Sequence, residues 1–249
     1  MTFQHLDVLN KKAETGHRAF NFLGDKMVKV VFMIDGWFMR KKIYQTKAFY
    51  YDGPGIRKYC CKHLRSDESI YRIFYYDTAP LDKKGHNPVS KKAIDFKTTK
   101  VAGEQIKLLD SIRKTPNFAL RLGKTVWKNN EWVLKPEKLR DLLAKKINID
   151  QLTENDVTPL IQQKAVDMKI GLDIASIATK RLADKLIIIT GDADIVPALK
   201  LARQEGMQVG IDPLWNPIKP ELREHVDFVN TKLRRPSGPS CSPTTSPIP

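Results

Sequence analysis

Aspartates directly follow several short apolar runs in this chain. The run at 28–34 ends at Asp35, the run at 70–76 ends at Asp77, and the run at 186–189 leads into Asp192 and Asp194. Such runs are typical of strands buried within a parallel sheet. Ligands of open parallel sheets bind outside the carboxyl ends of the strands. The spacing therefore predicts an acidic cluster at one edge of a sheet.

Two further aspartates fall on an expected helix at 163–182. Asp167 and Asp173 are six residues apart, and a rotation of about 100° per residue separates them by about 120° around the helix. Both positions flank the apolar stripe of the helix, so both side chains can lean toward the sheet. Asp167 is the stronger candidate because it lies in the first turn, nearest the strand ends.

Converging carboxylates favour a bound cation. Without one, at least one carboxylate would be protonated, at about 1.4 kcal/mol per unit of pKa shift. The five histidines show no metal-ligand spacing, and oxygen ligands favour Mg²⁺ or Mn²⁺ over zinc. Such a metal polarises a phosphoryl oxygen and lowers the pKa of bound water. The chemistry indicated is phosphodiester hydrolysis.

Each acid also has a structural alternative. Asp192 and Asp194 could cap the helix expected from about 195. Asp35 could begin an ordinary turn, and Asp77, which follows the run at 70–76, is better explained as a turn residue than as a ligand. Asp173 could be a buried acid that accepts backbone hydrogen bonds. The combination, rather than any single acid, favours a metal site.

The basic residues point to a polyanionic partner. Lysine and arginine total 43 against 28 acids, a net charge of +15, which attracts nucleic acid. A charge run is otherwise a solvated face, an exposed lysine needs no ligand, and a tryptophan near a strand end can simply pack. The residues predicted to contact nucleic acid are Trp37, Arg40, Lys41, Lys42 and Lys164.

Strands and helices alternate along the chain. A helix at 104–113 is followed by a strand at 119–127, and Asn129-Asn130 then predicts a hairpin into 131–134. Pro136 suits the first turn of the next helix. A helix at 195–205 and a strand at 208–211 complete the pattern. The class expected is α/β, with a mainly parallel sheet between two helical layers.

Three segments are expected. Residues 1–26 form an N-terminal extension, 27–230 the folded domain, and 231–249 a disordered tail rich in proline and serine. No apolar run approaches the roughly 18 to 20 residues that cross a bilayer, and no secretory signal is evident. The three cysteines lack a disulfide or zinc pattern, so a cytoplasmic protein without a membrane partner is expected.

Four sequence blocks resemble the NYN-domain family, the LabA-like branch of the PIN-like nuclease superfamily. The blocks are VVFMIDG at 30–36, YRIFYYDTAP at 71–80, QKAVDMKIGLDIA at 163–175 and ITGDADIVPALKLARQEGMQV at 189–209. The resemblance implies a Rossmann-like, PIN-type three-layer sandwich, an acidic site for Mg²⁺ or Mn²⁺, and RNA cleavage. By position, the family's acidic residues correspond to Asp35, Asp167, Asp192 and Asp194, with Asp173 as a further recurrent aspartate.

The chain departs from the family pattern in two places. An asparagine that often follows the first Asp-Gly is replaced by Trp37 and Phe38, and the usual Gly-Asp-Ser-Asp-Phe reads Gly-Asp-Ala-Asp-Ile around Ala193. Both changes keep the acids and remove polar groups that could orient a ligand.

The leading hypothesis is a metal-dependent endoribonuclease, a hydrolase. Its expected substrate is single-stranded RNA, and DNA is a second candidate. A homodimer is suggested by the resemblance alone. The second hypothesis is a binding module for nucleic acid or a partner that keeps the fold but cleaves weakly or not at all. The third is a phosphatase for small phosphoesters at the same site.

Overall fold

A seven-stranded sheet forms the centre of the computed structural model, which describes residues 27–234. Every neighbouring strand pair is parallel except β5 with β6. The mainly parallel sheet is therefore confirmed. In spatial order the strands are β6 (Val157–Lys164), β5 (Phe118–Leu134), β2 (Glu68–Thr78), β1 (Val28–Asp35), β7 (Lys185–Ile189), β8 (Gln208–Asp212) and β9 (Phe228–Val229).

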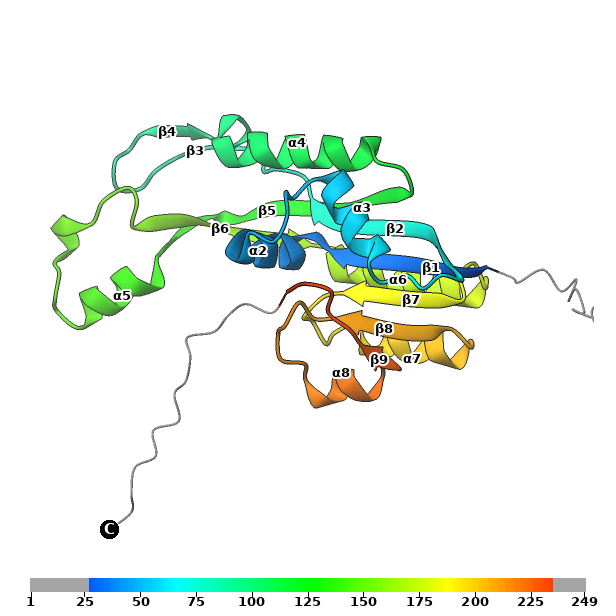
Figure 1. The fold of residues 1–249 in the computed structure, drawn as a ribbon. Coiled ribbons are helices and arrows are strands. Elements are labelled where there is room, and N and C mark those ends of the chain that lie inside the picture. Colours follow the sequence, from blue (N-terminus) through cyan, green and yellow to red (C-terminus); the bar gives the residue numbers. More distant parts are fainter. Residues whose placement is uncertain (1–26, 235–249) are drawn as a thin grey trace, which may run out of the picture.

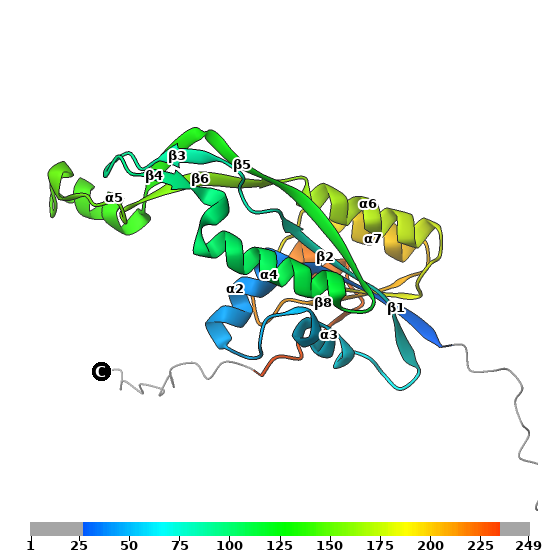
Figure 2. The same ribbon diagram turned by 90° about the horizontal axis from the view of Figure 1, so that it is seen from above.

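Helices cover both faces of the sheet, which confirms the expected three-layer α/β sandwich. Figure 2 shows α2, α3 and α4 on one side of the sheet and α6 and α7 on the other. The sequence pattern predicts no element between β1 and β2, where α2 and α3 lie. The helices are α2 (Gly36–Thr46), α3 (Gly53–Cys61), α4 (Lys100–Lys114), α5 (Pro136–Leu143), α6 (Val166–Thr179), α7 (Val196–Gln204) and α8 (Pro220–Glu224).

Strand β1 is buried on both faces. Val30, Phe32 and Ile34 belong to the core under α2, α3 and α4, whereas Val31 and Met33 belong to the core under α6 and α7. All five side chains are at most 1% exposed. Two covered faces explain why the run is continuously apolar instead of alternating, and burial of each large side chain contributes roughly 1.5–3 kcal/mol.

An arm formed by residues 124–164 extends beyond the carboxyl ends of the central strands (Figure 1). Residues 118–123 of β5 pair with β2, but 124–134 pair only with β6. The arm carries α5 and the 3₁₀ turn Ile149–Gln151. A short hairpin, β3 (Lys84–His86) with β4 (Ala93–Asp95), comes from the lysine-rich connection before α4.

The prediction of a hairpin at Asn129-Asn130 is wrong. Both asparagines have left-handed backbone (φ 50° and 56°), yet β5 continues in the same direction through them. Trp127 lies opposite Ile161 and Trp132 opposite Pro159, so the asparagines form a bulge in one long strand. The Trp127 indole N–H donates to the Glu131 carbonyl at 2.7 Å and closes this bulge. Strand β6, distant in sequence, supplies the pairing that a hairpin would have supplied.

The return of β6 determines where α6 begins. Because β6 runs antiparallel to β5, its last residue, Lys164, lies opposite Lys124, one residue past the end of the β2 pairing. Ala165 then turns the chain in the left-handed region (φ 66°), and α6 starts at Val166. The helix expected at 163–182 is therefore shorter, and Lys164 is a strand residue. Asp167, in the first turn of α6, comes to the carboxyl edge of the sheet.

The chain ends differ from expectation at one boundary. The N-terminal extension, 1–26, and the tail from 235 lie outside the described residues. Thr231, the expected start of the tail, donates to Asp212 Oδ1 at 2.8 Å, and Leu233 is buried. Residues past 230 thus pack on the end of β8. Between residues 27 and 234, no helix has the length and apolarity needed to span a membrane.

Substitution of Gly36 by alanine should destabilise the protein by about 1–3 kcal/mol. A Cβ there would lie 2.5 Å from Tyr75 Cζ and 2.6 Å from the Tyr76 carbonyl, since α2 starts directly over β2. Gly103→Ala is the matched control. Nothing lies within 4 Å of a Cβ at Gly103 in α4, so it should stabilise the helix by about 0.5–1 kcal/mol. Urea unfolding of both variants tests the difference, and an equal stability change would contradict the close approach.

Candidate functional site

Four of the five predicted metal-binding aspartates meet at the carboxyl edge of the sheet. Asp35 ends β1, and Asp192 and Asp194 follow β7, which is the direct neighbour of β1. Asp167 joins them from the first turn of α6. Strand order alone brings the first three together, and the arm brings the fourth. The expected acidic cluster is therefore a feature of the fold.

Asp35 is the most perturbed acid of this cluster. Its Oδ1 accepts a hydrogen bond from the Phe38 N–H at 3.0 Å, so the side chain is also the N-cap of α2. Burial is the main reason that the pKa of Asp35 is raised to about 6, and the Phe38 hydrogen bond opposes the shift. The charges of Asp167, Asp77 and Asp192 raise this pKa further. The Asp35 carboxyl is therefore half-protonated at about pH 6.

Asp167 connects the helix to the loop after β7. Partial burial raises the pKa of Asp167, and the charges of Asp192 and Asp194 raise it further. The charge of Asp192 therefore raises the pKa of both Asp35 and Asp167. Asp167 raises the pKa of Asp35 and Asp194 raises that of Asp167, so charge interactions connect the four carboxylates.

The helix-capping alternative for Asp192 and Asp194 does not match the structure. Helix α7 has Ile195 at its N-cap and no side-chain capping bond. Instead, Asp192 Oδ1 accepts from the Asp194 N–H at 3.1 Å, and the Asp192 N–H donates to Thr190 Oγ1 at 3.2 Å. These bonds shape the loop without occupying the Asp194 carboxylate.

Asp173 is not brought into the cluster. Its Oδ2 accepts hydrogen bonds from the Tyr76 hydroxyl and from Arg121 Nε, both at 2.9 Å. The expected buried acid is therefore partly right, but its partners are side chains rather than backbone groups. This carboxylate is neutralised by Arg121, and neither perturbed acid of the cluster is influenced by it.

Asp77 lies at the expected edge of the sheet, but as a buried residue of β2 rather than as a turn residue. It is a residue of β2 with 1% exposure, and Arg40 Nη1 lies 3.4 Å from its Oδ2. Burial raises the pKa of Asp77, and the Arg40 charge opposes this. Arg40, predicted to contact nucleic acid, is therefore engaged in the wall of the site.

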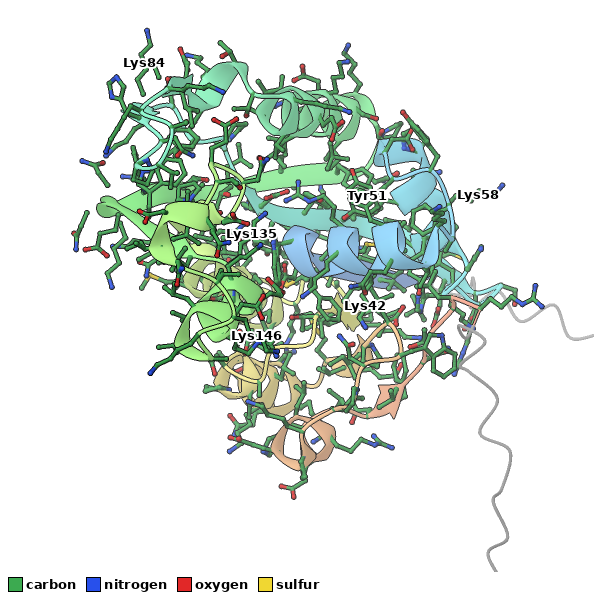
Figure 3. The ribbon with its side chains drawn as sticks, turned by 90° about the vertical axis from the view of Figure 1, so that its left-hand side faces the viewer. Lys42, Tyr51, Lys58, Lys84, Lys135 and Lys146 are labelled. Carbon is green, nitrogen blue, oxygen red and sulfur yellow. The ribbon has the colours of Figure 1, made fainter. Side chains whose placement is uncertain are left out.

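The other predicted nucleic-acid contacts surround the edge. Trp37, in the first turn of α2, is 50% exposed, and Lys41 Nζ lies 5.1 Å from its ring centroid. Lys164 is exposed at the end of β6, and Lys42 is half-buried on α2. Figure 3 faces the carboxyl edge and shows Lys42 there, with Lys135 and Lys146 of the arm on the same side of the molecule.

The donor chemistry of the cluster fits a hard divalent cation. Its ligating atoms are carboxylate oxygens, which Mg²⁺ and Mn²⁺ prefer, and the raised pKa values show the repulsion that a cation would relieve. In the part of the chain that the structure describes, no three histidine, cysteine or acidic side chains are already arranged around one ion position. The carboxylates are near one another without being preformed as a coordination shell.

Comparison with known proteins identifies one family. The sequence model of the NYN domain matches residues 94–227, which include Asp167, Asp192 and Asp194 but not Asp35. The uncharacterized protein y4oD of Sinorhizobium fredii is 32% identical over 69 residues, and the match spans only 32% of that protein. A Vibrio parahaemolyticus protein of unknown function, VPA0982, aligns over 84% of this chain and 94% of its own, with 13% identity and a TM-score of 0.46.

Replacement of Asp35 by asparagine should stabilise the metal-free protein at about pH 7.5 by about 3 kcal/mol. The folded-state pKa of Asp35 is about 6, above the ordinary value of 3.8. Its contribution to stability is therefore full below about pH 4 and is lost as pH rises through about 6. Asparagine keeps the N-cap and carries no charge.

The control is Asp52→Asn, which changes a second aspartate N-cap, that of α3. Its side chain accepts from the Gly55 N–H at 2.8 Å, and its replacement should leave stability nearly unchanged. Chemical denaturation in EDTA at about pH 4 and pH 7.5 measures both variants. A loss of stability in Asp35→Asn at the higher pH would contradict the raised pKa.

Proposed function

Since the chain belongs to the NYN domain family, which is part of the PIN-like nuclease superfamily, we propose that it is a metal-dependent endoribonuclease. The observation that carries the proposal is the electrostatic coupling of Asp35, Asp167 and Asp192 at the carboxyl edge of the sheet. Carboxylates that raise the pKa of a neighbouring carboxylate provide the negative potential that a divalent cation requires. A basic chain with such a site is suited to a polyanionic substrate.

Asp35, Asp167, Asp192 and Asp194 would hold Mg²⁺ or Mn²⁺. The bound metal would supply an activated water and a polarised phosphoryl oxygen. Two observations support this assignment: the capping bond to α2 fixes the Asp35 side chain, and Arg40 balances the buried charge of Asp77. We leave Asp173 out of this ligand set because its carboxylate is bonded to Arg121 and Tyr76.

Lys41 and Lys164 are the proposed contacts to substrate phosphates. Both are exposed, and both lie within three or six residues of a cluster aspartate in sequence. Positive charge beside the acids would offset the repulsion between the carboxylates and an approaching phosphate. RNA is the proposed substrate and DNA a second one to be tested. A homodimer and a cytoplasmic location stay predictions.

The alternative is a nucleic-acid- or partner-binding module with weak or no cleavage. It is favoured by the absence, among residues 27–234, of three side chains already gathered around one ion position. Trp37, Phe38 and Ala193 also stand where the family pattern has polar groups that could orient a ligand. Turnover distinguishes the two hypotheses.

Asp192→Asn should lower RNA cleavage at least about a hundredfold, since it removes charge from the centre of the cluster. Gel-resolved cleavage of labelled single-stranded RNA in Mn²⁺ or Mg²⁺ measures the rate, with EDTA as the metal-free control. Asp150→Asn, in the exposed 3₁₀ turn of the arm, should cleave like wild type. Full activity of Asp192→Asn would exclude the proposed site, and no cleavage by a folded wild-type protein on varied RNA and DNA would favour the binding module.

Metal binding can be measured without turnover. Mn²⁺ at a hundredfold its Kd should stabilise wild type by about 2.7 kcal/mol, seen as a rise in Tm. Asp167→Asn should lose most of this rise because it removes a proposed ligand. Asp173→Asn should keep the rise, although loss of its bonds to Arg121 and Tyr76 lowers the starting Tm. The reverse pattern would return Asp173 to the ligand set.

A further inference from the structure

Three adjoining hollows form one groove that leads away from the acidic edge. The first, of about 450 Å³, lies between Trp37 of α2 and the base of the arm, where Ile161 and Gln163 line it. The second, of about 210 Å³, lies between α2 and α4 and shares Trp37 and Arg40 with the first. The third, of about 840 Å³, shares Tyr44 with the second. We refer to the second and third hollows as the α2–α4 groove.

Exposed aromatic rings line this groove. Trp37, Tyr44 and Tyr50 are 50%, 58% and 84% exposed. Among residues 27–234 the exposed aromatics are these three and Trp215, so most of them gather along one path. Trp37 and Tyr44 are seven residues apart, which places them on one face of α2 about 10.5 Å apart along its axis. Tyr51, in contrast, is buried, with its hydroxyl 3.1 Å from that of Tyr75.

Lysines accompany the rings. Lys41 lies over the Trp37 ring, and Lys47 and Lys107 line the third hollow. The two acids in the groove are both engaged. Asp52 caps α3 through Gly55, and Glu104 lies 4.0 Å from Lys100. The groove therefore combines flat apolar rings with positively charged lysines.

A single-stranded nucleic acid has the complementary combination. Its bases offer flat faces that stack on aromatic side chains, and its phosphates lie between them. A duplex hides its base faces, and its phosphates alone would reach the lysines. An apolar peptide would use the rings but would leave the lysines without anionic partners.

We propose that the α2–α4 groove binds single-stranded RNA, with bases stacked on Trp37, Tyr44 and Tyr50 and phosphates beside Lys41, Lys47 and Lys107. The groove holds the strand on one side of the cleavage position, because Trp37 is two residues from Asp35 and Arg40 bridges to Asp77. This inference rests on the proposed nuclease function and specifies how that site selects single strands.

The test is the binding of fluorescein-labelled oligouridine of about 4 to 16 nucleotides, the range of known single-stranded sites. Anisotropy is measured in EDTA, so that no metal-dependent cleavage occurs. Affinity should rise with length in wild type. Trp37→Ala and Tyr44→Ala should each weaken the binding of the longest oligomer about tenfold, whereas Trp37→Phe and Tyr44→Phe, which keep a ring, should stay within about threefold of wild type. A blunt RNA duplex should bind more weakly than the single strand.

Leu172→Ala is the matched control. Leu172 is 64% exposed on α6, the other face of the sheet, and its loss should not change binding. Equal affinity of the alanine variants and wild type, equal binding of duplex, or no binding of any oligomer by folded wild type would each overturn the proposal. The last outcome would make an apolar peptide the better occupant.

The experiment separates this inference from the nuclease proposal. Ring-dependent binding in EDTA without cleavage in Mn²⁺ would keep the groove and exclude the nuclease. Metal-dependent cleavage with binding that does not depend on the rings would support the nuclease and exclude the groove. Asp192→Asn, which should not cleave, should bind oligouridine at least as well as wild type, since it removes a negative charge near the phosphates.

Discussion

The parallel pairing of β1 with both β2 and β7 is the interaction on which the rest of the structure depends. It buries Val30 to Ile34 between two helical layers. The next residue, Asp35, ends the strand half-buried at the rim of this core, and because a buried charge is costly, its pKa is raised. The same register brings Asp77 and the loop with Asp192 to the same edge. The strand that is most apolar thus ends at the point where negative charge accumulates.

The aspartates near this edge differ in whether a cationic side chain balances their negative charge. Asp77 is balanced by Arg40 and Asp173 by Arg121, so these acids are structural parts of the wall. Asp35 and Asp167 have no such cationic partner among the described residues, and their pKa values are raised. A divalent cation would balance the negative charges of Asp35 and Asp167. Among the described residues, the lack of a cationic partner therefore separates Asp35 and Asp167 from Asp77 and Asp173.

The arm has two consequences for the site. Its return strand, β6, delivers α6 to the carboxyl edge, so that Asp167 faces the ends of β1 and β7. Its base also forms one wall of the first hollow opposite Trp37. Gly123 permits the close approach of β5 to the end of β6, since a Cβ there would lie 2.5 Å from the Lys164 carbonyl. The arm thus positions a proposed ligand and extends the surface available to a substrate.

The sequence by itself determined β1, β2, β7 and β8, the α/β class and the aspartates that end or follow those strands, because burial on both faces leaves a continuous apolar run with a polar end. It did not determine the long β5 or the role of Asn129-Asn130, since a left-handed pair suits a hairpin or a bulge until the partner strand is known. Only the tertiary structure decided that Arg121 neutralises Asp173, that Arg40 pairs with Asp77, and that Trp37, Tyr44 and Tyr50 line one groove. Those contacts join residues distant in the chain, and local periodicity carries no information about which side chains the packed layers bring together.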